Sequence, residues 1–242
     1  MFPRLAVAAL LGLLTPVCLA APAPPQEPID LRLSAAITVG ADGTMQSLEW
    51  RNQLPVLKMI AERIEPAVRG WHFEPGRLDG TAAPTQTYLN VVFKGLPAPD
   101  GSMKLAFVSA DTGAASPTMV VPEYPKRAIT QNAAYTADLF AIVDFDAQGV
   151  PSLRSYDYYG ERRLRDEFVE STRAAVAKWK IELERVGGHP VATSMRIPFR
   201  YCIGGCPPLP REEADKGGDS ERAVALDSAV KLLDARDPLA GI

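Results

Sequence analysis

Two passages of the 242-residue chain repeat each other at a constant offset of 108 positions. A tryptophan and two charged residues are among six identities without a gap, which pair Ala67 with Ala175, Val68 with Val176, Trp71 with Trp179, Glu74 with Glu182, Arg77 with Arg185 and Gly80 with Gly188. Six identities without a gap are not expected by chance. It implies that one structural unit is built twice, and this constrains the fold more than any other feature of the sequence.

Hydrophobic periodicity predicts the same order of elements in both copies. In the first copy it predicts a strand over 29–40, a strand through Trp50, a helix from Val56 and a last strand over 85–94. We expect this helix to end near Glu65, because Pro66 follows. In the second copy it predicts strands over 139–145 and 153–159, a helix over 162–178 and a last strand over 192–201. The predicted fold class is α+β, with two tandem modules ordered strand, strand, helix, strand, strand, each an antiparallel sheet with its helix packed on one face.

The repeat also sets the predicted domain limits. These are a signal peptide at 1–20, a linker at 21–28, the first module at 29–95, a bridge at 96–121, the second module at 122–202 and a tail at 203–242. The bridge is rich in Pro, Gly, Ser and Ala and has one short strand candidate at 103–108. The tail begins with a polar, proline-rich run that we expect to be flexible. A short amphipathic helix is predicted over 220–235, with Ser220 as its N-cap.

The first twenty residues have the pattern of a secretory signal peptide. Arg4 precedes an apolar stretch, and small residues at Cys18 and Ala20 occupy the positions that a signal peptidase reads. We predict cleavage after Ala20 or Ala21, and hence export. An uncleaved membrane anchor and a lipoprotein modified at Cys18 are the alternatives.

Two cysteines remain after removal of the signal peptide, and both lie in the run Y-C-I-G-G-C. In an exported chain, thiols as close as Cys202 and Cys206 indicate a disulfide, and the two glycines between them allow the tight turn that it needs. A metal site would need ligands besides these two cysteines, but neither His72 nor His189 is close to them in the sequence. A redox-active pair stays open as an alternative.

Composition and motifs exclude several functional classes. The net charge is −3 without a basic cluster, which argues against nucleic acid as a partner. No nucleophile elbow, phosphate-binding loop or dinucleotide-binding glycine pattern is present, so we expect no enzyme activity, no cofactor and no metal. Trp71 and Trp179 each end a predicted helix and start a strand, which predicts core anchors rather than ligand-stacking residues. Alternation along a strand explains two of the tyrosines in the aromatic run at 156–159.

Three segments resemble parts of the C-terminal domain of the TonB family, the periplasmic energy transducers of Gram-negative bacteria. They are P-E-Y-P-K-R-A at 122–128, V-D-F-D-A-Q-G-V at 143–150, and A-V-x-x-W with the following F-E-P-G and D-G at 67–80. The second copy resembles a complete domain of this kind and the first copy most of one. The first copy lacks the Tyr-Pro opening. The second has 181–184, I-E-L-E, in place of the glycine turn, and 134–136, A-Y-T, where the family usually places a glycine.

The resemblance implies a periplasmic protein that binds by β-augmentation, in which a partner strand adds beside the last strand of the domain. That strand corresponds here to 192–201, and we expect Thr193, Ser194 and Arg196 to form the peptide-binding edge. The prediction is therefore a soluble periplasmic TonB-like protein that binds a protein or peptide partner, such as an envelope or outer-membrane protein. The alternative is an energy transducer with an uncleaved anchor, which alone would bring the chain to a membrane. A tether of only about eight residues before the first strand favours the binding module.

Overall fold

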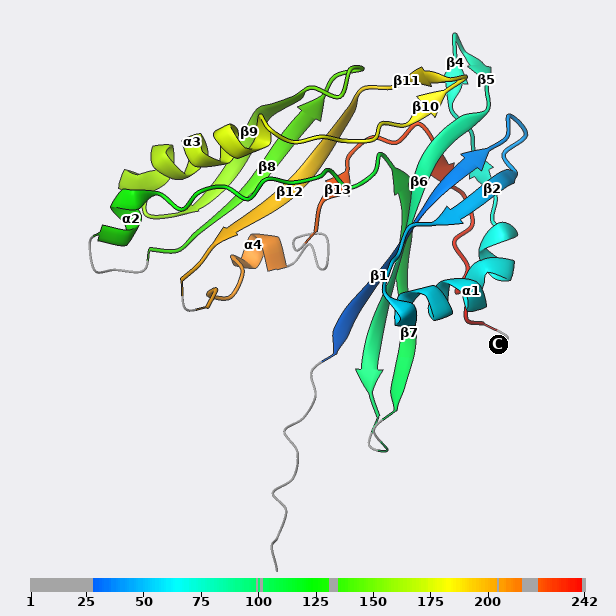
Figure 1. The fold of residues 1–242 in the computed structure, drawn as a ribbon, viewed down its shortest axis with the longest axis horizontal. Helices are drawn as coiled ribbons and strands as arrows, with labels where there is room; N and C mark the ends of the chain where they lie inside the picture. The colour runs from blue at the N-terminus through cyan, green and yellow to red at the C-terminus, as the bar shows by residue number, and fades with distance from the viewer. Residues whose placement is uncertain are drawn as a thin grey trace, which may run out of the picture.

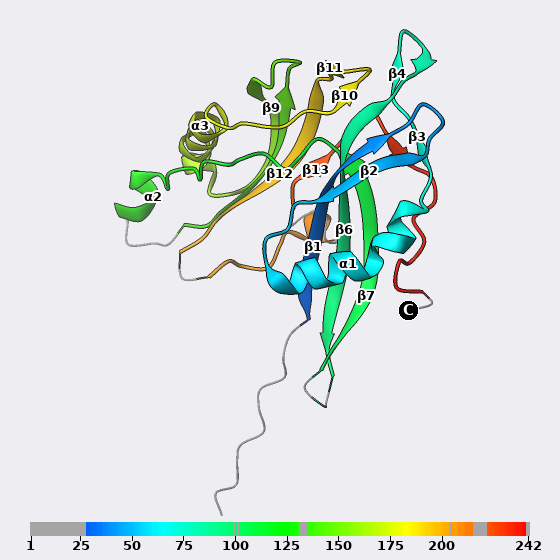
Figure 2. The same cartoon turned by 45° about the vertical axis from the view of Figure 1, so that its right-hand side comes forward.

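A computed structural model of the protein describes residues 28–98, 100, 102–130, 135–203, 205–214 and 222–240 (Figure 1). The predicted signal peptide, nearly all of the linker and Ser220 lie outside these residues. Two antiparallel sheets, each with one longer helix against it, form a strand-rich α+β architecture (Figures 1 and 2). Among the described helices, none is long and apolar enough to cross a membrane.

The first half of the chain builds most of the first sheet, and β10 (Arg185–Val186) and β11 (His189–Pro190) from the second half extend it beside the start of β6. Its strands stand in the order β7-β6-β1-β2, and helix α1 lies against one face. The elements are β1 (Ile29–Val39), β2 (Met45–Trp50), α1 (Pro55–Arg69), β3 (Phe73–Glu74), β4 (Arg77–Leu78), β5 (Thr81–Ala82), β6 (Thr85–Pro97) and β7 (Met103–Gly113).

The second sheet repeats the connectivity of the first. Its order β12-β8-β9 matches β6-β1-β2, so the duplication seen in the sequence is present in the topology. The second copy contributes α2 (Lys126–Thr130), β8 (Ala137–Phe145), β9 (Pro151–Gly160), the 3-10 helix η1 (Arg162–Leu164), α3 (Arg165–Val176) and β12 (Thr193–Tyr201). Its β10 and β11, which lie between α3 and β12, join the first sheet, where β10 pairs with β6. A tail with α4 (Arg211–Ala214), β13 (Val224–Ala225) and β14 (Lys231–Leu232) follows.

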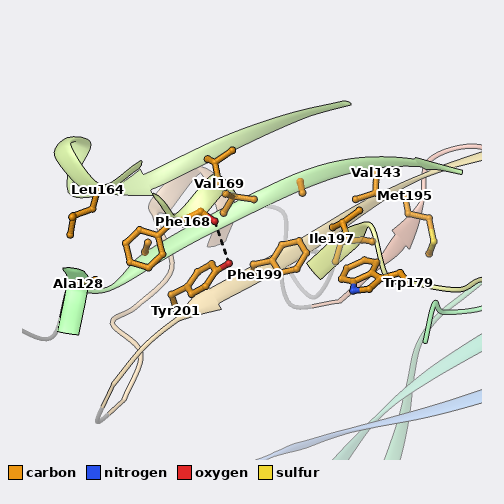
Figure 3. Packing of buried hydrophobic residues seen from close by; sticks show 14 of the residues in the cluster. Ala128, Val143, Leu164, Phe168, Val169, Trp179, Met195, Ile197, Phe199 and Tyr201 are labelled. Atoms are coloured by element: carbon orange, nitrogen blue, oxygen red, sulfur yellow. Dashed lines mark hydrogen bonds between the residues drawn. The ribbon is translucent and has the colours of Figure 1, made fainter. Parts of the chain in front are cut away.

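Each helix covers its own hydrophobic core, and the two predicted tryptophan anchors are buried in these cores. Trp71 is 4% exposed and Trp179 is 3% exposed. Figure 3 shows Trp179 beside Ile197 and Phe199 of β12; its ring stacks on Phe199 at 5.5 Å, and its Nε1 donates to the Val120 carbonyl over 3.0 Å. The prediction of core anchors is confirmed.

Helix α1 continues past Pro66, so the predicted end near Glu65 was wrong. A proline in this place removes the main-chain bond to the Glu62 carbonyl. Glu62 and Pro66 are both on the exposed side of the helix, where water can satisfy that carbonyl. Ile64 and Val68 on the other side are fully buried, and their packing holds the last turn.

The bridge is also different from its prediction, because half of it forms strands of the first sheet. Strand β7 pairs with β6 from Tyr88 to Pro97, a longer ladder than the short strand candidate at 103–108. Burial along β7 does not alternate strictly, so period-two alternation predicted only part of this strand.

The tail contains two short strands in place of the predicted helix over 220–235. Strand β13 pairs with β12 of the second sheet, and β14 pairs with β3 of the first unit, so the described part of the tail reaches both units (Figure 1). Val230 between them is fully buried in the first core, whereas Leu226 and Leu233 of the expected apolar stripe are 50% and 64% exposed. Pairing with two sheet edges and burial of Val230 outweigh the helical periodicity of an isolated segment.

Candidate functional site: the outer edge of the second sheet

Strand β12 is the edge strand to which the sequence assigned binding. All nine of its residues pair with β8 on the inner side. On the outer side, the Ser194 N–H donates to Asp227 and the Ser194 carbonyl accepts from the Leu226 N–H. Because successive residues of an antiparallel strand point their main-chain groups to opposite sides, Arg196, Pro198 and Arg200 also face outward, and Thr193 faces β8.

The predicted binding residues Thr193, Ser194 and Arg196 lie on this strand, but their stretch of the edge is not open. Strand β13 pairs there, with Ala225 opposite Met195 and Val224 opposite Arg196. The expectation of an open edge at these positions is therefore corrected. The chain's own tail adds a strand, which the sequence did not reveal because two residues carry no periodic signal.

The edge beyond Arg196 differs between the two units. In the first unit, β7 pairs with the outer side of β6 along Tyr88–Pro97. At the offset of 108, the residues 197–201 correspond to 89–93 of β6. Within the described residues, no strand pairs with the outer side of this stretch of β12. The second unit therefore presents main-chain groups that the first unit uses to bind a strand.

A hollow of about 390 Å³ lies beside this stretch, between the edge and a segment of the bridge. We call it the edge hollow. Its lining is mostly apolar and consists of Met119, Val120, Val121, Pro122, Tyr124, Trp179, Pro198, Phe199, Arg200, Tyr201 and Cys202. Val121 is 82% exposed. Sequence reasoning missed the contribution of 119–122, for which the apolar run M-V-V in a polar bridge was the available signal.

The edge hollow has a filled counterpart in the first unit. There, Phe107 of β7 pairs with Phe93, and its ring lies 5.9 Å from the Phe93 ring and 6.4 Å from the Trp71 ring. The residues at the offset of 108 from Phe93 and Trp71 are Tyr201 and Trp179, and both line the edge hollow. The repeat thus places the same pair of aromatic positions beside a paired edge in one unit and beside an unpaired edge in the other.

The polar groups around the edge hollow suit binding of a neutral or apolar side chain. Desolvation by burial raises the pKa of Tyr201 and of Tyr124, so both hydroxyls are neutral at ordinary pH. The Tyr201 hydroxyl lies 2.7 Å from the Thr172 hydroxyl. Arg200 turns its guanidinium to Asp138, with Nε donating over 2.8 Å to a carboxylate that is almost fully buried.

The predicted disulfide is present and lies directly after the last residue of β12. Cys202 and Cys206 are bonded, with their Cα atoms 5.0 Å apart. The Arg200 guanidinium donates to the Pro207 carbonyl on the far side of this loop. The three predicted tyrosines divide as alternation requires: Tyr156 and Tyr158 pack on the second core, and Tyr159 meets Phe140 on the other face.

Comparison of the chain with protein-family models, curated proteins and solved structures finds no match. The resemblance to the TonB C-terminal domain therefore remains a prediction. In the part of the chain that the structure describes, no group of three or more His, Cys, Asp or Glu residues is placed to hold a metal ion.

Proposed function

We propose that this protein is a periplasmic binding module that captures an extended segment of a protein or peptide partner by strand addition. The segment pairs with the outer edge of β12 over residues 197–201 and places an apolar or aromatic side chain in the edge hollow. The predicted signal peptide and the Cys202–Cys206 disulfide support export, and the resemblance to the TonB family supports the periplasm.

One observation carries the proposal: the equivalent edge of the first unit already binds a strand. Strand β7 pairs with β6 and sets Phe107 against Trp71 and Phe93. Strand addition gains affinity from main-chain hydrogen bonds and specificity from pockets for alternate side chains. Both are present at the second edge, in the outward groups of Arg200 and in the hollow beside Trp179.

Pro198 limits how many bonds this edge makes. It faces outward without an N–H, so a strand finds the Pro198 carbonyl and both main-chain groups of Arg200 in this stretch. Proline at such a position also discourages unspecific pairing between sheet edges. The expected ligand therefore depends on its side chain in the hollow as much as on main-chain pairing.

The sequence of β7, residues 103–113, provides a probe for the test. A fluorescently labelled peptide of this sequence is titrated with the protein, beside a peptide with alanine at the position of its phenylalanine. We expect the first peptide to bind, and the alanine version to bind about tenfold more weakly, the factor that corresponds to about 1.4 kcal/mol.

Two variants of one residue isolate the main-chain contribution. Arg200→Pro removes the outward N–H, whereas Arg200→Ala keeps it, and both lose the ion pair with Asp138. Circular dichroism checks that both are folded. We expect the proline variant to bind at least tenfold more weakly than the alanine variant. Equal binding by the two folded variants, or no binding of the peptide to the wild-type protein, would contradict strand addition at this edge.

A further inference from the structure

The tail segment on β12 has the features of a bound peptide. Strand β13 runs antiparallel to β12, with Val224 opposite Arg196. The Leu226 N–H donates to the Ser194 carbonyl over 2.8 Å. These are the contacts that any extended ligand would make at an edge, and here the chain makes them with itself.

A carboxylate completes the contact. Asp227 Oδ1 accepts the outward Ser194 N–H over 2.8 Å and the Thr193 hydroxyl over 3.1 Å. Two donors that converge on one carboxylate oxygen favour an acidic residue over an apolar one, because bonds to an ionised acceptor are the stronger kind. This stretch of the edge thus recognises a short strand that is followed by an acidic residue.

The tail is held on both sides of β13, because Arg222 pairs with Asp111 of β7 over 2.9 Å before it and a second anchor follows it. Val224 and Ala225 are only partly buried, and Leu226 is half exposed. The tail is fixed further on, where Val230 is fully buried in the first core and the Ala229 N–H donates to Glu184. Displacement of β13 therefore exposes little apolar surface and leaves this anchor in place.

Strand direction connects this stretch with the proposed ligand site. A ligand that pairs as β7 does, antiparallel to its edge, runs from Tyr201 toward Ile197 and then meets Arg196. Arg196 is where β13 begins to pair. A longer ligand and β13 therefore compete for the same main-chain groups.

We infer that the edge at residues 193–196 is a binding site for an extended peptide segment that ends in a carboxylate side chain, and that β13 and Asp227 are its built-in competitor. The inference rests on the proposed function, because it describes how the same ligand strand continues past Arg196. It assigns the partner a chemistry: a short β-strand with a small apolar residue, followed by Asp or Glu.

The test uses a synthetic peptide with the sequence of residues 222–229, R-A-V-A-L-D-S-A, and a second version with Asn in place of Asp. Both are titrated with the full-length wild-type protein, with Asp227→Ala, and with Asp234→Ala as the matched control. Asp234 is an acidic residue of the same tail whose salt bridge is to Arg236. We expect Asp227→Ala to bind the Asp peptide at least tenfold more tightly than the wild type and the control do. We also expect Asp227→Ala to bind the Asn peptide at least tenfold more weakly than the Asp peptide.

Hydrogen exchange of the Leu226 amide gives a second measurement in the wild-type protein. Saturation with the Asp peptide is expected to speed this exchange, since displacement of β13 frees the amide. Equal affinity of the Asp peptide for all three proteins, or equal affinity of Asp227→Ala for both peptides, overturns the inference. If these results occur while the 103–113 peptide still discriminates Arg200→Pro from Arg200→Ala, the proposed function stands and only the role of the tail is wrong.

Discussion

Replacement of Glu184 by alanine tests how the two units and the tail are joined. Glu184 is 2% exposed and accepts three hydrogen bonds from two distant parts of the chain. The donors are the Thr87 hydroxyl of β6 at 2.5 Å, the Ser228 hydroxyl at 2.9 Å and the Ala229 N–H at 2.9 Å. One buried side chain therefore links the second unit to the first sheet and to the tail.

The expected loss follows from what each donor does without Glu184. The Thr87 hydroxyl has a second acceptor in the Gly113 carbonyl at 3.2 Å, and the Ser228 hydroxyl has the Thr112 hydroxyl at 3.4 Å. Each of these bonds should therefore cost about 1 kcal/mol. Within the described residues, the Ala229 N–H has no acceptor other than Glu184, and a buried donor left without a partner costs about 1 to 3 kcal/mol. We expect Glu184→Ala to lower the free energy of unfolding by about 3 to 5 kcal/mol.

Glu182→Ala is the matched control, two residues away on the same segment. Glu182 accepts two bonds from Arg51 at 2.6 and 2.9 Å and one from the Tyr88 hydroxyl at 2.6 Å, but its side chain is 58% exposed. An exposed ion pair contributes at most about 1 kcal/mol. Urea denaturation of both variants, with hydrogen exchange of the Ala229 amide, measures the difference. A loss at Glu184 no larger than at Glu182, with Ala229 still protected, would refute this account of the joint.

Three further predictions concern the core, the edge hollow and pH. Trp179→Ala should lower the free energy of unfolding by about 3 to 5 kcal/mol in urea denaturation, because it removes a buried ring, and an unchanged midpoint would show that the ring is not part of the core. Val121→Asp should weaken binding of the 103–113 peptide about tenfold without a change in stability, since this side chain is exposed at the rim of the hollow. Hydrogen bonds from Arg51 and Tyr88 lower the pKa of Glu182 to about 2, so its contribution to stability is present above pH 4.5 and is lost as the pH falls toward 2. The stability difference between the wild type and Glu182→Gln should shrink over that range, and a difference independent of pH would contradict the assignment.

Local periodicity predicted the repeated elements well. Strands β1, β8 and β12 and helix α3 begin and end within a few residues of their predicted limits. In these elements, one face packs on a core that the same repeat supplies, so the pattern of apolar residues reflects the burial directly. The two tryptophans were predicted for the same reason, because each stands where a helix meets a strand of its own unit.

Elements that form on a distant partner were not predictable in this way. Strand β14 pairs with β3, which lies far back in the chain, and β13 pairs with β12 beyond the intervening tail segment. Strand β7 is the second strand of a hairpin with β6, and only its part at 103–108 was predicted. A strand of two residues has no measurable alternation, and its position depends on which edges are open once the rest has folded. The same holds for the candidate site. The sequence predicted binding at β12, but only the structure showed that β13 covers its first residues and that the bridge lines the hollow beside its last ones.

The departures of the second copy from the first copy have a structural cause in the joint between the units. Gly76 of the first copy stands where a Cβ would come within 2.6 Å of Thr85 and Val186, so the turn there excludes a side chain. Its counterpart at the offset of 108 is Glu184, whose carboxylate reaches Thr87 and the tail. Glu182, two residues earlier, bonds to Arg51 and Tyr88 of the first unit.

The run I-E-L-E at 181–184 therefore replaces a glycine turn with contacts that a single, isolated module would not need. The divergent Glu184 lies where one unit touches the other, although Glu182, which the two copies share, contacts the first unit as well. The two tryptophans, which also agree, each pack in the core of their own unit. The tail is anchored at the same joint, because Ser228 and Ala229, a few residues after β13, donate to Glu184. Glu184 thus joins the two copies and also anchors the tail beyond β13.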